Sequence, residues 1–132
     1  MRLLIKPKKK LGVYQQITTE NTNWYWLNFE ARLMKKGEQW CFETKENEIV
    51  IVLLGGNFKV ESNKGKWETK NGRKDVFSGI AHTLYLPRET TFTLTAQSGV
   101  LDIAYGWCLA DETFKPKFLL PEDTPIVIFG GD

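Results

Sequence analysis

The sequence predicts an all-β protein, a single small antiparallel β-barrel with little helix. Apolar and polar residues alternate with a period of two in several stretches, whereas no segment shows a sustained helical period. Turn signals rich in Gly, Asn and Ser separate these stretches at regular intervals, which is typical of an antiparallel sandwich or barrel. The five Trp and eight Phe residues favour a β-rich fold with a well-filled interior.

The N-terminal third contains one clearly alternating segment. Leu3–Ile5 is predicted as a short strand, and Gly12–Ile17 as a connector with some strand character. Trp24–Leu33 alternates throughout, as a strand with one buried face does. We expect the buried face to carry Tyr25, Leu27, Phe29, Ala31 and Leu33, and the opposite face Asn28, Glu30 and Arg32.

The central block, Gly37–Gly56, joins two predicted strands. Glu38–Lys45 is a mixed polar strand, and a short polar turn leads from it into Ile49–Leu54. Because this apolar run is short and rich in β-branched residues, we expect a fully buried strand. The glycine pair that follows it supplies the backbone freedom of a tight reversal.

The remaining segments continue the same alternation. Turn signals with Gly, Asn or Ser separate most of them, and Pro87, which follows the fourth, cannot donate to a sheet ladder. The predicted strands are Phe58–Glu61, Lys66–Lys70, Asp75–Phe77, Thr83–Leu86, Thr91–Ala96 and Val100–Leu109.

At 132 residues and 15.2 kDa, the length indicates one folded domain, which we place at residues 1–110. Residues 111–132 are expected to form an extended linker that ends in an apolar strand, Ile126–Phe129. The net charge of +2 gives no argument for nucleic acid, and no apolar run approaches the roughly 20 residues of a membrane span. Cys41 and Cys108 match no metal or redox spacing, so we expect free thiols and a cytoplasmic protein.

The spacing of the central block resembles the first motif of the cupin superfamily, a family of small β-barrels. Gly37 and Gly55 take the glycine places and Glu48 the glutamate place, while Glu43 and Lys45 stand at the two histidine places. In the second motif, Pro87-Arg88-Glu89 takes the place of Pro-x-Gly, and Phe92 that of the third histidine. Cupins hold a metal with these histidines, and a charged lysine cannot replace one because it offers donors only. We therefore predict a cupin-type, jelly-roll-like barrel with no bound metal or other cofactor.

A more specific resemblance is to bacterial 5-deoxy-glucuronate isomerases, which act in inositol breakdown. It rests on short blocks whose order and spacing agree over nearly the whole chain: Leu3–Pro7, Gly37-Glu38, Glu43-Thr44, Asn47-Glu48, Val52–Leu54, Gly72-Arg73, Val76-Phe77, Ala81–Pro87 and Leu119–Pro125 with the closing Gly-Gly. Members of that family carry two cupin barrels, and this sequence resembles the first. In the related hexuronate isomerases the metal lies in the second.

The resemblance implies the non-metal half of a sugar-acid isomerase. We do not expect this half to be catalytic alone, and we predict no catalytic residue in it. If it is an enzyme, the reaction is an aldose–ketose isomerisation. A stand-alone module that binds a sugar or sugar acid is the alternative. We expect the barrel to associate with a partner cupin domain or with further copies of itself, using Ile126–Phe129 and the face that a second barrel would cover.

Six residues are candidates for substrate binding. If the motif mapping holds, Glu43 and Lys45 point into the barrel near Glu48, either as an ion pair in a wet barrel mouth or as a sugar-acid pocket with Lys45 beside the carboxylate. The single histidine cannot make a zinc site alone, and is expected to be a hydrogen-bonded strand residue. The full candidate set is Glu43, Lys45, Glu48, His82, Tyr85 and Arg88.

Overall fold

The computed structural model describes residues 11–17, 28–69 and 81–120, and all regular structure in these ranges is β-strand. The prediction of an all-β chain is therefore confirmed for this part of the molecule. The strands are β1 (Gly12–Ile17), β2 (Asn28–Lys35), β3 (Gln39–Glu43), β4 (Asn47–Gly55), β5 (Phe58–Ser62), β6 (Lys66–Glu68), β7 (Thr83–Leu86), β8 (Thr91–Ala96), β9 (Val100–Leu109) and β10 (Lys117–Leu119).

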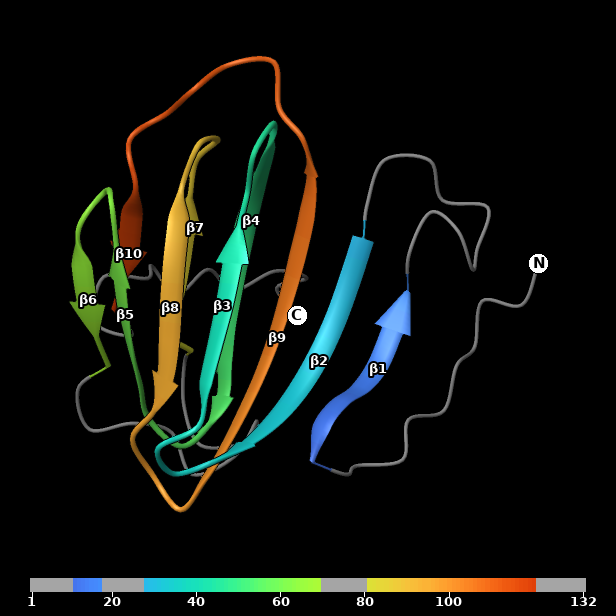
Figure 1. Ribbon diagram of the computed structural model, residues 1–132, viewed down its shortest axis with the longest axis vertical. Coiled ribbons are helices and arrows are strands. Elements are labelled where there is room, and N and C mark those ends of the chain that lie inside the picture. The colour runs from blue at the N-terminus through green and yellow to red at the C-terminus, as the bar shows by residue number, and fades with distance from the viewer. Residues whose placement is uncertain (1–10, 18–27, 70–80, 121–132) are drawn as a thin grey trace, which may run out of the picture.

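The strands form two antiparallel sheets that lie one over the other (Figure 1). One sheet has the order β1-β2-β9-β4-β7-β10, and the other has the order β3-β8-β5-β6. The facing sides of the two sheets enclose a single apolar core, as in a closed or sandwiched all-β domain. The core residues are Met34, Trp40, Ile49, Ile51, Leu53, Phe58, Val60, Leu84, Leu86, Phe92, Leu94, Ala96, Leu101, Ile103 and Tyr105.

The alternation in the second half of the chain predicted both strand ends and buried faces. β7, β8 and β9 begin and end at the predicted residues. In β8 the apolar members Phe92, Leu94 and Ala96 are buried, as expected for a strand with one face on a core. In β9 the same holds from Leu101 to Tyr105.

The prediction that Ile49–Leu54 is buried on both faces is wrong. Ile49, Ile51 and Leu53 are fully buried, but Val50 between them is 38% exposed. β4 lies inside the six-stranded sheet, so only one of its faces meets the other sheet. The apolar run therefore contributes to the core with one face and to the outer surface of the sheet with the other.

The predicted inward face of β2 is also wrong. Met34 belongs to the core, and the same face carries Arg32, whose guanidinium lies over the ring of Trp40, and Glu30. Ala31 is buried on the opposite face. Alternation defines two faces but does not tell which one meets the core, and the pairing of β2 with β9 decides it here.

The glycine pair at the end of β4, Gly55 and Gly56, makes the expected reversal. Gly56 has a φ of +89°, a conformation that side chains with a Cβ rarely adopt. A Cβ at this position would also lie 2.4 Å from the carbonyl oxygen of Val100. The turn therefore requires glycine for two independent reasons.

Within the predicted linker, residues 117–119 form β10, which pairs with β7 at an edge of the six-stranded sheet. The predicted strands Leu3–Ile5, Asp75–Phe77 and Ile126–Phe129 lie outside the described residues. In the described ranges no helix is long and apolar enough to span a membrane.

Candidate functional site

Glu43 and Lys45 do not point into the barrel. β3 directs Trp40 and Phe42 toward the core, so the alternating neighbour Glu43 is exposed. Lys45 is exposed as well and lies beyond the strand, in a turn with a φ of 53°. The predicted inward orientation of this pair is therefore wrong, because β3 places Glu43 on its outer face and ends before Lys45.

The segment around Lys45 has a structural role. The backbone N–H of Glu89 donates to the carbonyl oxygen of Lys45 at 2.8 Å. The buried hydroxyl of Thr44 donates to the carbonyl of Pro87 at 3.0 Å and accepts from the backbone N–H of Thr90 at 2.9 Å. Glu89 itself has a φ of 59°, the conformation for which glycine is the usual residue at this motif place. These bonds hold two chain reversals together.

Glu48 and Tyr85 are brought together, but on the outer face of the six-stranded sheet. The hydroxyl of Tyr85 on β7 donates to Oε2 of Glu48 on β4 at 2.7 Å. Burial, and then the hydrogen bond and charge of Glu48, raise the pKa of Tyr85 to about 12. Cys108 lies opposite Glu48 on β9, and burial followed by the Glu48 charge raises the pKa of its thiol. Both Tyr85 and Cys108 therefore remain protonated at neutral pH.

His82 and Arg88 lie apart from this pair. The buried ring of His82 stacks on Phe118 of β10, with ring centroids 5.8 Å apart. Nη1 of Arg88 donates to the carbonyl oxygens of Ala110 at 3.0 Å and Asp111 at 3.3 Å. Nη1 of Arg88 thus attaches the segment that leads to β10, while its buried Nε has no hydrogen-bond partner among the described residues.

Aromatic rings fill the barrel interior around Phe92, which stands at the place of the third motif histidine. Phe92, at the third histidine place, is 1% exposed and meets Trp40 edge to face at 5.2 Å. Trp40 also stacks on Tyr105 at 4.1 Å, and Phe42 meets Trp107 at 5.7 Å. Across the described ranges, no group of three or more His, Cys, Asp and Glu side chains could hold a metal ion. The residues present do not fit the metal site of a histidine-bearing cupin, because ring carbons offer no lone pairs.

One polar network reaches into this aromatic interior. The hydroxyl of Tyr105, which is 1% exposed, donates to Oε1 of Glu30 at 2.6 Å and accepts from Nε of Arg32 at 3.1 Å. Arg32 lies over the Trp40 ring, with 4.9 Å from Cζ to the ring centroid. Gln16 on β1 donates to the other oxygen of Glu30. Burial, and then the Glu30 hydrogen bond, raise the pKa of Tyr105, although Arg32 opposes the shift, so the phenol stays protonated.

The alternation of residues predicted Glu30 and Arg32 on the outer face of the strand, and no function was predicted for them. Their spacing of two residues was a signal that both share one face of a strand. The partner Tyr105, 75 residues after Glu30 in the chain, becomes a neighbour only through the register between β2 and β9. No local pattern shows that register.

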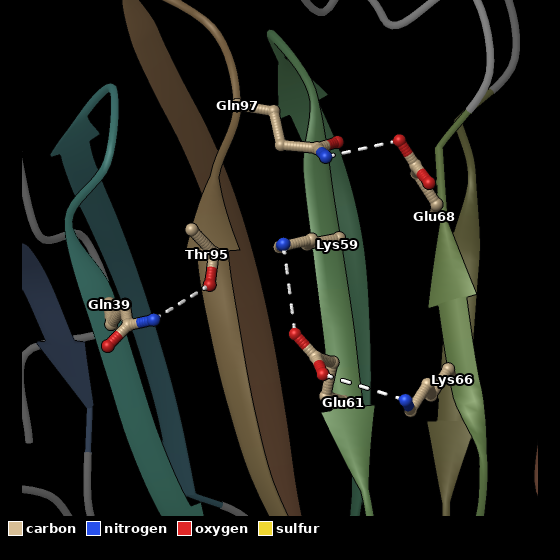
Figure 2. A network of polar contacts seen from close by, with 7 residues as sticks. All are labelled: Gln39, Lys59, Glu61, Lys66, Glu68, Thr95 and Gln97. Atoms are coloured by element: carbon tan, nitrogen blue, oxygen red, sulfur yellow. Dashed lines mark hydrogen bonds and ion pairs between the residues drawn. The ribbon is translucent and has the colours of Figure 1, made fainter.

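The outer face of the four-stranded sheet is solvated and polar (Figure 2). Lys59 and Lys66 form ion pairs with Glu61, all with exposed side chains. Beside them, Gln97 donates to Glu68, and Gln39 on β3 donates to Thr95 on β8. Exposed pairs of this kind contribute little to stability, and charges of both signs alternate along the face. Nothing in this arrangement selects one ligand class.

Comparisons with solved structures identify the fold. An IolB-like protein from Salmonella typhimurium LT2 superposes with a TM-score of 0.85 at 23% identity, covering 93% of this chain and 47% of that one. A cupin protein from Bacteroides fragilis superposes with a TM-score of 0.59 at 12% identity, covering 97% and 100% of the two chains. The expected cupin-type fold is therefore confirmed.

Comparisons with curated sequences give distant relatives. The 5-deoxy-glucuronate isomerase of Geobacillus kaustophilus is 27% identical over 123 residues, which are 91% of this chain and 44% of that enzyme. The 5-deoxy-glucuronate isomerase of Bacillus subtilis strain 168 is 24% identical over 130 residues, or 94% and 48%. This chain thus spans about half the length of these relatives. The model of the KduI/IolB family matches residues 3–132. The protein belongs to the KduI/IolB family.

Proposed function

We propose that the protein is the non-metal cupin domain of a 5-deoxy-glucuronate-type isomerase and has no isomerase activity alone. The observation that supports this most directly is the aromatic interior. In a barrel of an isomerase family, Phe92, Trp40 and Phe42 occupy the space in which a metal site would need nitrogen and oxygen ligands. The match to about half of two named isomerases agrees with a domain that needs a second one.

The chemistry of the interior supports the same proposal. Aldose–ketose isomerisation moves a proton between neighbouring carbons, so it needs a base of suitable pKa beside the substrate. The Tyr105 phenol stays protonated at neutral pH, and both oxygens of Glu30 already accept hydrogen bonds. These groups are arranged to hold one another, not to exchange protons with a substrate.

Proton NMR of 5-deoxy-glucuronate tests the proposal. The isolated protein is expected to leave the aldose signals unchanged, while the full-length Geobacillus kaustophilus isomerase provides the positive control. Co-expression with a neighbouring reading frame that encodes a second cupin with clustered histidines is expected to produce conversion. Turnover by the metal-free isolated protein would show that the chemistry lies in this barrel.

A second candidate is a stand-alone binding module for a sugar or sugar acid. The observation that favours it is the network of Arg32, Glu30 and Tyr105 beside the Trp40 ring, because charged groups next to an aromatic face are common in carbohydrate sites. A gene that lies apart from sugar-catabolic genes, together with sugar-acid binding by the isolated chain, would favour this function over the first.

The proposal includes association and location. We expect a homo-oligomer or a complex with a partner cupin barrel, and light scattering at micromolar concentration measures this. A monodisperse mass near 15.2 kDa would contradict the homo-oligomer. If an oligomer forms, deletion of residues 124–132 is expected to weaken it. Free thiols at Cys41 and Cys108 agree with a cytoplasmic location.

A further inference from the structure

We propose that Arg32, together with Glu30 and the ring of Trp40, forms a binding site for a hydroxylated carboxylate in the mouth of this barrel. The inference rests on the proposed relation to sugar-acid isomerases and adds the residues that would hold the ligand. It replaces Lys45, which the sequence suggested for the carboxylate and which lies exposed in a turn.

Arg32 is held in place with part of its donor set unused. Its Nε donates to Tyr105, and its Cζ lies over the Trp40 ring, 4.9 Å from the ring centroid, within the range of a cation–π contact. None of the described residues accepts a hydrogen bond from the terminal amino groups Nη1 and Nη2 of Arg32, which carry four of the five guanidinium N–H donors. A planar pair of amino groups matches the two oxygens of a carboxylate.

The exposure of the side chains in this network increases from the core toward the solvent. Tyr105 is buried, Arg32 and Glu30 are half-buried, and Gln16 is exposed. These residues come from β9, β2 and β1, and in Figure 1 no strand of the four-stranded sheet is drawn over β1 or β2. Because Arg32 is half-buried, a ligand on its terminal amino groups would meet a partly desolvated guanidinium.

Glu30, the second charged group beside Trp40, restricts the chemical class of ligand that could bind. Glu30 lies two residues from Arg32 on the same face of β2, so their Cβ atoms are separated by about 7 Å. A carboxylate accepts hydrogen bonds from hydroxyl groups but repels a second anion. The pair thus favours a ligand with a carboxylate at one end and hydroxyls at the other, and Trp40 offers an apolar ring face to its carbon skeleton.

Titration of the full chain with D-glucuronate tests this inference. Binding is measured by calorimetry and by the shift of the tryptophan indole N–H signals in proton–nitrogen NMR. D-Glucose, which lacks the carboxylate, and acetate, which lacks the hydroxyls, are the ligand controls. Arg32→Lys keeps the charge and loses the planar pair of donors, Glu30→Gln keeps the shape and loses the acceptor charge, and Lys66→Gln removes an exposed cation from the far side of the other sheet.

We expect D-glucuronate to bind at least tenfold more tightly than D-glucose or acetate, and Arg32→Lys to weaken it at least tenfold, since a bidentate charge-assisted contact is lost. Lys66→Gln should leave the affinity unchanged.

Equal binding of all three ligands, equal effects of Arg32→Lys and Lys66→Gln, or no saturable binding to the wild type would overturn the inference. A cooperative thermal unfolding transition of Arg32→Lys shows that the variant is folded. Loss of binding leaves the isomerase proposal intact, because that proposal is decided by the conversion of 5-deoxy-glucuronate.

Discussion

Replacing Tyr105 by phenylalanine removes one oxygen atom from the barrel interior and keeps the ring that stacks on Trp40 at 4.1 Å. The lost hydroxyl donates to Glu30 at 2.6 Å and accepts from Arg32 at 3.1 Å. The substitution therefore separates the polar network from the aromatic packing. No other described residue donates to Oε1 of Glu30.

The expected cost follows from the partners. Hydrogen bonds to charged groups contribute about 1.5–3 kcal/mol each, and water can replace part of this because Glu30 and Arg32 are half-buried. We expect the free energy of unfolding to fall by about 2 kcal/mol. With an unfolding entropy of about 2.1 cal/mol/K per residue, this lowers the melting temperature by about 7 °C.

Tyr85→Phe is the matched control. Tyr85 makes one hydrogen bond to a single carboxylate, Glu48, on the outer face of the sheet. Its removal is expected to cost about 1 kcal/mol or less. Urea denaturation followed by tryptophan fluorescence measures both variants. A cost for Tyr105→Phe no larger than that for Tyr85→Phe would refute the assignment of the interior network as the stronger one.

Three further predictions concern the turns, pH and metals. Gly56→Ala is expected to destabilise the fold by about 3 kcal/mol, because of the positive φ and the overlap of the new Cβ with Val100. Gly37→Ala has a similar φ but no atom within 4 Å of the added Cβ, so it should cost about 1 kcal/mol. Urea denaturation measures both variants. The raised pKa of Tyr85 favours the folded state while the phenol is protonated, so its contribution is complete below pH 10 and lost as the pH rises toward 12. Between pH 8 and 11, the wild type should therefore lose more unfolding free energy than Tyr85→Phe, and equal losses would count against the raised pKa. Elemental analysis after dialysis is expected to find no stoichiometric zinc, manganese or iron. A full equivalent of any of these metals would contradict the prediction that this barrel binds no metal.

The sequence by itself determined where most of the described strands lie. In β8 and β9, apolar residues occupy one face and polar or small residues the other, so the period of two fixed both the ends and the buried side. The glycine pair likewise predicted the reversal at the end of β4, because the positive φ at Gly56 favours glycine. The overall cupin fold was predicted from the resemblance of the Gly37–Gly56 block to a cupin motif.

The tertiary structure decided which face of an ambiguous strand meets the core. In β2 and β4, apolar side chains stand on both faces, so burial depends on which strands lie alongside and opposite. The same reason explains the candidate site. Glu43 and Lys45 stand at two places of the motif but lie outside the interior, whereas Glu30 and Arg32 contact Tyr105 of β9 through the sheet register. Strand periodicity is a local property of the chain, but register and the overlap of two sheets depend on contacts between distant segments, and only the folded structure shows them.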